Sequence, residues 1–169
     1  ILFWNHDKKT GNSKAKDYYL KYPKNKNYFL SNIKRCIANK SSYVVLPLGV
    51  KFSSGSGGHF NIILIDKINK TIERFEPYGV ETLEDFKIMS EFDRIFEKEV
   101  NFFKYKYISA NMLCPDEGIQ TFEERQVSNR IKTAINLNSD PIGYCIAWSI
   151  YYVDMRLTYP KIKHKILIK

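Results

Sequence analysis

Three residues whose side chains could take part in catalysis are separated in the sequence: His59, Glu76 and Cys145. His59 follows the glycine-rich run SSGSGG and opens the apolar stretch HFNIILID, whereas Glu76 closes the stretch TIERFE 17 residues later. A carboxylate beside an imidazole fixes the tautomer and orientation of the ring, and the ring can then activate a nucleophile. The pair therefore predicts nucleophilic chemistry if the fold joins the two side chains. The alternative is an ordinary surface histidine near a strand end.

The two apolar stretches, 59–66 and 71–76, are predicted to form a β-hairpin around the turn KINK. With a two-residue loop at the centre of this turn, Asn61 lies opposite Glu76. His59 is then the diagonal neighbour of Glu76 on the same face, within reach of its side chain. A register that differs by one residue would instead turn Glu76 to the other face of the hairpin.

Cys145 is the candidate nucleophile. It opens the apolar run CIAWSIYYVDMRL (145–157) just after Gly143, a residue that permits an unusual backbone. The run is apolar around most of a helical circumference, which predicts a central, buried helix. A thiolate at a helix N-terminus is stabilised by the helix dipole and, further, by a nearby protonated histidine. The alternative is a small buried apolar residue, the commoner role of a free cysteine.

The other two cysteines are weaker candidates. Cys36 lies within a predicted helix (27–40) on its apolar face, which indicates a core position, and Cys114 lies in MLCPDEG, an exposed stretch without a helix start. Three cysteines with no CxxC spacing do not suggest a disulfide framework. We therefore expect a reducing compartment, the cytoplasm or the interior of a host cell.

Thiol attack on a carbonyl also needs donors for the developing oxyanion. The backbone N–H of Cys145 is one donor, and a side-chain amide is a suitable second. The chain has two glutamines, Gln120 after the turn-like CPDEGI and Gln126 in FEERQ. Gln126 is typical of a solvated helix surface, so Gln120 is the better candidate, although a solvated side chain is the alternative there as well.

The rest of the chain must position these residues. Its predicted parts are an irregular basic arm (1–27), a helix (27–40), a buried strand (42–52), an amphipathic helix capped by Thr82 (82–101), a strand (103–109) and an unassigned polar stretch (110–140). Pro47 indicates a bend or an edge position in the strand 42–52. With the hairpin and the apolar helix, the sequence predicts one α+β domain over residues 1–169, a sheet packed by helices.

Composition narrows the class of protein. The chain has 169 residues, of which 44% are hydrophobic and 15% aromatic, as is typical of a globular domain. It has no apolar run long enough for a bilayer and no secretory signal pattern, and it begins at Ile1, as an excised domain or a processed product would. The net charge of +9 is compatible with a nucleic acid or an acidic protein as partner, and equally with a solvated lysine-rich surface.

The ordered set GGHFN, RFEPYG, CPDEGIQ and GYCIAWSIYYVDMRLTYP resembles the clan CE cysteine peptidases, which include the SUMO-specific (Ulp/sentrin-type) proteases and the adenovirus protease. The pattern, over about residues 42–160, is most similar to Ulp-type domains of giant DNA viruses, and the Lys/Asn/Ile-rich composition fits an AT-rich genome. The resemblance implies a papain-like α+β fold of the Ulp/adenain type. In this fold a central mixed sheet packs against a buried helix that starts at the nucleophile.

The resemblance also implies roles for the matching positions. The implied catalytic residues are His59 as general base, Glu76 as its orienting acid, Cys145 as nucleophile and Gln120 in the oxyanion hole. The implied substrate-binding residues are Phe60, Gly143, Tyr144 and Trp148. Phe60 stands where SUMO proteases commonly have a tryptophan that helps to roof a tunnel over a Gly-Gly tail.

Two positions depart from the family pattern. Glu76 stands where SUMO proteases usually have the shorter aspartate. The family glutamine stands only a few residues before the cysteine, whereas Gln120 precedes Cys145 by 25 positions. Either residues 121–139 form an inserted loop that returns the chain to the site, or the amide role is lost and Asp140 caps the helix or polarises the site.

The sequence thus predicts a cysteine peptidase that cuts peptide or isopeptide bonds after small residues. Its substrates would be proteins carrying ubiquitin-like modifiers, of the ubiquitin or SUMO type, or viral precursor proteins. We expect no metal, no cofactor and no membrane contact, a monomer, and a location inside the host cell or in the virion. The alternatives are an acetyl-CoA-dependent acyltransferase of the same clan and a non-enzymatic basic module that binds nucleic acid.

Overall fold

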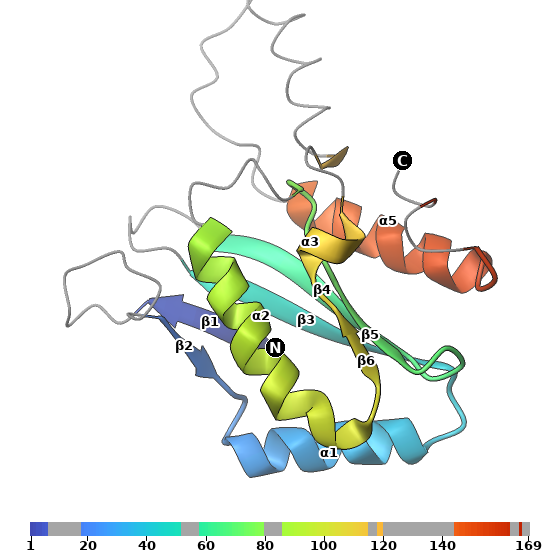
Figure 1. Cartoon of the computed structure of the whole chain (residues 1–169), viewed down its shortest axis with the longest axis horizontal. Coiled ribbons are helices and arrows are strands. Elements are labelled where there is room, and N and C mark those ends of the chain that lie inside the picture. Colours follow the sequence, from blue (N-terminus) through green and yellow to red (C-terminus); the bar gives the residue numbers. More distant parts are fainter. Residues whose placement is uncertain are drawn as a thin grey trace, which may run out of the picture.

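The computed structural model describes residues 1–6, 18–51, 58–79, 86–114, 118–119, 144–162 and 166. They form a mixed six-stranded sheet with helices on both faces (Figure 1), so the predicted α+β class is confirmed. The strands are β1 (Leu2–His6), β2 (Tyr18–Lys21), β3 (Tyr43–Lys51), β4 (Gly58–Asp66), β5 (Thr71–Phe75) and β6 (Lys106–Ile108). The helical elements are α1 (Lys26–Ala38), α2 (Phe86–Val100), η2 (Asn101–Phe103), α3 (Ala110–Leu113) and α5 (Tyr144–Thr158).

The sheet has the strand order β2-β1-β3-β4-β5-β6. The pairs β1–β3 and β5–β6 are parallel, and the other three pairs are antiparallel. The hairpin β4–β5 has the predicted register, because Asp66 pairs with Thr71 and Ile62 with Phe75. This register brings Asn61 beside Glu76 at the open end of the hairpin.

The turn of this hairpin explains its register. Asp66 Oδ1 accepts the backbone N–H groups of Ile68 and Asn69, each at 2.9 Å. Such a turn, in which a side chain bonds the backbone two or three residues on, is a common use of aspartate. Lys70 closes the turn in the left-handed region, with φ 54°. The sequence KINK therefore makes a tight turn without an Asn-Gly pair.

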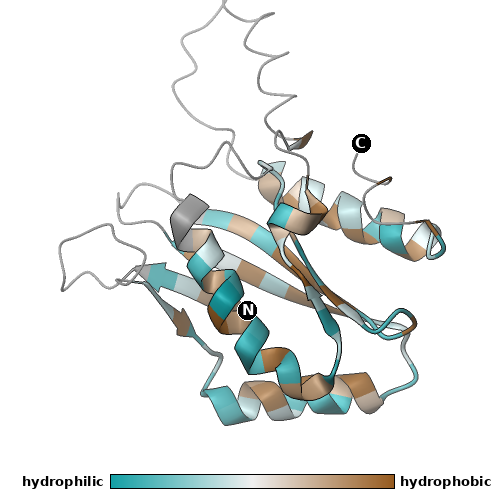
Figure 2. Ribbon diagram, viewed as in Figure 1, coloured by the Kyte–Doolittle hydropathy of each residue, from teal (hydrophilic) through white to brown (hydrophobic). Residues whose placement is uncertain are grey.

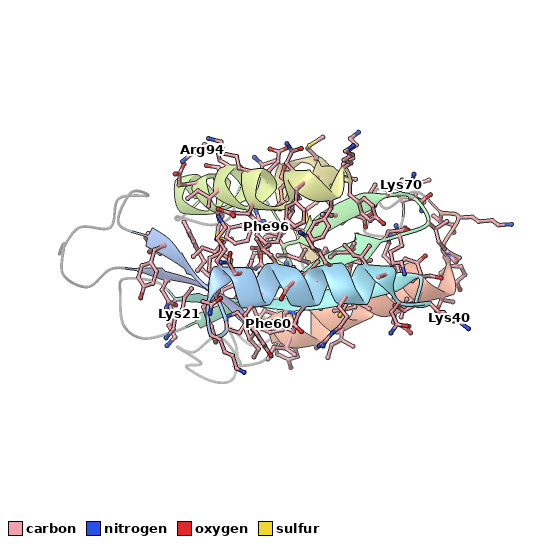
Figure 3. All side chains as sticks on the ribbon, turned by 90° about the horizontal axis from the view of Figure 1, so that it is seen from below. Lys21, Lys40, Phe60, Lys70, Arg94 and Phe96 are labelled. Atoms are coloured by element: carbon pink, nitrogen blue, oxygen red, sulfur yellow. The ribbon has the colours of Figure 1, made fainter. Side chains whose placement is uncertain are left out.

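Apolar residues pack on both faces of the sheet. On the face of α1 and α2, a core of buried side chains includes Ile63, Ile65, Phe92 and Phe96. Teal and brown residues alternate along α1 and α2 in Figure 2, as expected of helices with one buried side. Figure 3 shows the sheet between α2 and α5, and a second apolar cluster lies on the α5 face.

The prediction of an irregular arm over residues 1–27 is wrong for the part that the structure describes. β1 lies inside the sheet, where Leu2 and Trp4 are 1% and 0% exposed. The Trp4 ring packs 5.8 Å from Tyr18 and 5.6 Å from Phe92 between ring centroids. The available signal is the short continuous apolar run ILFW at residues 1–4, which stands beside a polar, basic stretch.

The predicted strand 42–52 is confirmed as β3, which is internal to the sheet rather than at its edge. β1 covers only part of β3, since it pairs with residues 48–51. Pro47 therefore lies on the half of β3 that β1 leaves open, where a missing N–H costs no ladder hydrogen bond. The expectation of an edge position holds for this half of the strand.

Helix α5 is confirmed, but its predicted burial is wrong. Its buried residues, Ser149, Tyr152 and Arg156, face the sheet. Ile150 and Leu157 are 60% and 48% exposed on the outer side. Tyr152 and Arg156 face inward because they hydrogen-bond polar partners on the hairpin, described below. An apolar surface around most of a helix predicts a central position, yet among the described residues only the sheet side of α5 is covered.

Two further predictions concern helix ends and membrane contact. The helix predicted over 82–101 is α2, and its proposed cap Thr82 lies outside the described residues. In the part of the chain that the structure describes, no helix combines the length and the apolar character needed to cross a bilayer.

Candidate active site

The open end of the β4–β5 hairpin joins an imidazole to a carboxylate. His59 Nε2 lies 2.5 Å from Glu76 Oε1, and the two side chains are only 4% and 2% exposed. The Tyr78 ring packs against the His59 ring, with 4.9 Å between centroids. The diagonal contact predicted from the hairpin register is therefore present, and it is buried rather than on the surface.

Further donors surround the Glu76 carboxylate. Asn61 Nδ2 donates to Oε2 at 2.9 Å, the Tyr78 N–H donates to Oε1 at 3.1 Å, and Arg74 Nη1 lies 3.7 Å from Oε2. Burial alone would raise the pKa of Glu76. The charge and hydrogen bond of His59, the charge of Arg74 and the Tyr78 N–H outweigh burial and lower this pKa below its usual value. The carboxyl is therefore ionised.

Behind Glu76 lies a second buried charge pair that the sequence reasoning missed. Arg74 Nε and Nη2 donate to the two oxygens of Asp93, on α2, at 2.6 and 2.8 Å. Arg74 Nη1 donates to Asn61 Oδ1 at 2.7 Å, and the Tyr107 hydroxyl donates to Asp93 Oδ1 at 2.6 Å. Strand alternation pointed to Arg74 and Asn61, since each lies two residues from a site residue on the same face. Nothing in the sequence pointed to Asp93.

Cys145 enters the site from α5, on the other side of the sheet from α2. It is the second residue of the helix and is partly buried. Its side chain hydrogen-bonds the His59 side chain, and the backbone N–H groups of Phe60 and Ile146 also donate to its sulfur. Because His59 Nε2 is engaged by Glu76, the ring nitrogen available to Cys145 is Nδ1.

This arrangement favours a thiolate beside an imidazolium. Burial raises the pKa of the Cys145 thiol, but the hydrogen bond and charge of His59 and the two backbone donors lower it below the ordinary value. Burial lowers the pKa of His59, but the Glu76 charge and the hydrogen bonds with Cys145 and Glu76 raise it to about 9. The two groups titrate as a coupled pair, which holds one proton on the imidazole.

The other predicted site residues divide into described and undescribed ones. Phe60 is partly buried. It lies two residues before Ile62 on β4 and therefore on the same sheet face, the one that α5 covers; its side chain is labelled in Figure 3. Tyr144 is exposed, and Trp148 is partly buried with its ring edge-on to Tyr151. Gln120, Gly143, the stretch 121–139 and Asp140 lie outside the described residues, so their roles stay predictions.

The chain just before Gln120 is tied to the site. The Gly118 N–H donates to the carbonyl oxygen of Tyr78 at 2.8 Å, and Ile119 packs against the apolar cluster on the α5 face. Gly118 lies so close to the turn after Glu76 that a Cβ atom there would be 2.0 Å from the carbonyl oxygen of Pro77. Only glycine fits this approach of two backbones.

Replacing Gly118 with alanine is therefore expected to destabilise the protein by about 1–3 kcal/mol, the range for overpacked sites. Gly49→Ala is the matched control, because a Cβ there meets the Phe3 ring, a side chain that can rotate away, rather than backbone. Urea denaturation of the two variants measures the difference. Equal losses in both would contradict the close backbone contact.

The two remaining cysteines exchange their predicted environments. Cys36 is exposed rather than in the core, because the buried row of α1 runs through Phe29 and Ile33 toward Ile37. Cys114 is buried rather than exposed, and its sulfur accepts the Glu76 N–H at 3.3 Å. Burial raises the pKa of Cys114 to about 12. Cys114 is therefore a protonated thiol whose sulfur accepts a hydrogen bond from the backbone of Glu76.

Within the described residues, no group of three or more His, Cys, Asp or Glu side chains is arranged to hold a metal ion.

Comparison with known proteins gives a sequence match to a viral protein and a weak structural match to a bacterial protein. No protein-family model matches the chain. In an alignment of 139 positions that covers 73% of the chain, it is 32% identical to an ankyrin repeat protein of Acanthamoeba polyphaga mimivirus, of which it spans 16%. Among solved structures, the Legionella pneumophila effector protein RavZ matches 85% of the chain and 45% of its own, at 13% identity. The TM-score of 0.38 is too low to define a shared fold.

Proposed function

We propose that this protein is a cysteine peptidase with Cys145 as nucleophile, His59 as general base and acid, and Glu76 as the residue that orients His59. One observation carries the proposal: the His59 ring hydrogen-bonds buried Glu76 through Nε2 and also hydrogen-bonds Cys145 near the start of a helix. This is the arrangement that nucleophilic thiol catalysis requires, a nucleophile in contact with a base and a base held by a third group.

The residues then have the following roles. His59 holds the Cys145 proton, and the thiolate attacks the substrate carbonyl carbon, so that a carbon–sulfur bond forms and the carbonyl becomes an oxyanion. The Cys145 N–H stabilises this oxyanion, and Gln120 is the proposed second donor. His59 returns the proton to the leaving amine as the carbon–nitrogen bond breaks. His59 then takes a proton from water, the hydroxide attacks the thioester, and the acid product and free thiol are released.

We propose a protein substrate that is cut after a small residue, either a ubiquitin-like modifier at its C-terminus or a viral precursor. The similarity to a mimivirus protein supports a viral setting. Aromatic side chains lie on both elements of the site, with Tyr78 against the His59 ring and Trp148 one turn after Cys145, and we propose that they contact the substrate chain. The carboxylate of Glu76 holds the His59 ring, so the ring can keep one orientation during both formation and hydrolysis of the thioester.

A panel of electrophilic probes tests the proposal. Ubiquitin and SUMO bearing a C-terminal vinyl sulfone are expected to add to the protein at Cys145, with no addition in Cys145→Ala and unchanged addition in Cys36→Ser. Iodoacetamide is expected to label Cys145 before Cys114 at neutral pH, because the thiol pKa is lowered at Cys145 and raised at Cys114. Labelling of Cys114 as fast as Cys145 would rule out the proposed nucleophile. If iodoacetamide selects Cys145 and neither modifier probe reacts, the viral precursor is the substrate class.

A further inference from the structure

Helix α5 is fastened to the hairpin by a buried polar cluster far from the candidate active site. Arg156 Nε donates to Glu73 Oε2 at 3.0 Å, and Arg156 Nη2 donates to Glu73 Oε1 at 3.0 Å and to Asp66 Oδ2 at 2.8 Å. The Tyr152 hydroxyl also donates to Glu73 Oε2, at 2.6 Å. Each of these four residues is at most 2% exposed. We call them the anchor cluster: Asp66, Glu73, Tyr152 and Arg156.

The hydrogen bonds of the anchor cluster are nearly complete. Glu73 Oε1 also accepts from Thr71, and the Asp66 oxygens accept from the turn residues Ile68 and Asn69. Arg156 Nη1 reaches the Ile162 carbonyl oxygen, just beyond the helix, at 3.4 Å. Buried charges are costly unless paired and hydrogen-bonded in this way. A cluster of this kind fixes one geometry, because each bond depends on direction.

The anchor cluster and the candidate active site share the same two elements. Asp66 lies at the turn end of the hairpin, whereas His59 lies near its open end. On the helix, Arg156 follows Cys145 by 11 residues, which is about 16 Å along the axis. One hairpin therefore holds one helix at two points, and both points on the helix belong to its sheet side.

Apolar contact alone would hold this helix loosely. Its outer residues Ile146, Ile150 and Leu157 are exposed, so among the described residues no element presses it onto the sheet from outside. Between the two points, the Tyr152 ring lies parallel to the Phe75 ring, with 4.4 Å between centroids and 4° between planes. Apolar contact is non-directional, so by itself it opposes sliding or turning of a helix less than directed hydrogen bonds do. The directed bonds of Arg156 oppose such movement.

We propose that Arg156 is a positioning residue: it locks α5 to Glu73 and Asp66 and thereby keeps Cys145 in hydrogen-bonding contact with His59. The inference rests on the proposed function, which makes that contact the centre of the reaction. It assigns Arg156 no contact with substrate. Lysine in its place would keep the positive charge but lose the planar pair of donors that grips Glu73 at both oxygens.

The test measures alkylation of two thiols in one molecule. Iodoacetamide reacts with Cys145 and with the exposed Cys36, and mass spectrometry of the two peptides gives their rate ratio in mildly acidic buffer. The variants are Arg156→Lys and the milder Tyr152→Phe, which removes one hydroxyl and keeps the ring. The control is Ile33→Ala, a cavity in α1 on the other side of the sheet. Circular dichroism defines a temperature at which all four proteins are folded.

In the wild type, Cys145 is expected to react faster than Cys36. Arg156→Lys is expected to lower the ratio about tenfold, the change that one unit in a thiol pKa produces. Tyr152→Phe is expected to lower it less, and Ile33→Ala to leave it unchanged while lowering the melting temperature. With a cleavable substrate, Arg156→Lys is expected to lower kcat and leave KM unchanged.

The outcomes separate the two proposals. A wild-type Cys145 no faster than Cys36 refutes the activated thiol, and with it both the proposed function and the inference. An activated wild-type thiol with an unchanged ratio in Arg156→Lys refutes the inference alone. So does a ratio that falls equally in Ile33→Ala, because the cluster then acts only through stability. If Arg156→Lys does not fold, Tyr152→Phe decides: an unchanged ratio in that variant refutes the inference.

Discussion

Turnover is expected to fall by about a thousandfold or more when His59 is replaced by alanine, because the variant loses both the base and the charge that stabilises the thiolate. Glu76→Gln is expected to have a smaller effect, since glutamine keeps a hydrogen bond to the ring but not the carboxylate charge. The measurement is steady-state cleavage of the substrate identified by the probe panel. Full activity in His59→Ala would contradict the proposed mechanism.

The pH dependence follows from the same pair. The raised pKa of His59, about 9, means that the imidazolium is lost as the pH rises through that value, so activity declines above it. The lowered pKa of Cys145 means that the thiolate persists below the usual thiol range, so activity declines only at a lower pH. In His59→Ala the sulfur of Cys145 stays buried but loses the imidazolium that stabilises its charge. The thiol pKa therefore rises, and alkylation of Cys145 should require alkaline pH. Unchanged alkylation in mildly acidic buffer would contradict the ion pair.

The free energy of unfolding is expected to fall by about 3–5 kcal/mol when Arg74 is replaced by leucine, the usual cost of breaking a buried ion pair. Leucine leaves the carboxylates of Glu76 and Asp93 buried without their shared cation. Urea denaturation at neutral pH gives the loss. The matched control is Arg94→Leu, because Arg94 belongs to an exposed ion pair with Glu91 on α2, and its replacement should leave stability unchanged.

The sign of the pH effect offers a second check on Arg74. Without the cation, the pKa of Glu76 rises, because its charged form loses the stabilisation that Arg74 supplies. The deficit in stability is therefore largest at neutral pH and shrinks as the pH falls and this carboxyl takes up a proton. A deficit that stays constant down to acidic pH would mean that the arginine acts through packing against Phe92 rather than through charge.

The hairpin was predictable because its information is local. Alternation of apolar residues and one tight turn set the register, and the register alone places Glu76 diagonal to His59. Helix α5 was also predictable, from a continuous apolar run that starts at the cysteine. The contact between Cys145 and His59 could be expected only from the family resemblance, because the two residues stand 86 positions apart and no local pattern encodes it.

The errors share a physical cause, in that burial depends on partners distant in sequence. Leu2 and Trp4 form a buried strand although the stretch around them is basic. Cys36 and Cys114 have the reverse of their predicted exposure, because the first turns away from the sheet and the second supports the Glu76 backbone. Helix α5 buries its arginine and exposes its isoleucines because the Glu73 and Asp66 carboxylates, on the strands beneath the helix, hydrogen-bond Arg156. Hydropathy alone cannot anticipate such an inversion.

The chain has two tryptophans, and they lie in the two separate apolar clusters. Trp4 is fully enclosed beneath α2, whereas Trp148 stands one turn after Cys145 and is partly open to solvent. The two tryptophans are therefore expected to fluoresce at different wavelengths, with the emission of buried Trp4 at a shorter wavelength than that of Trp148 beside the thiol. Quenching by a small solute such as iodide would act on the second first, so light emission can separate local changes near the cysteine from global unfolding.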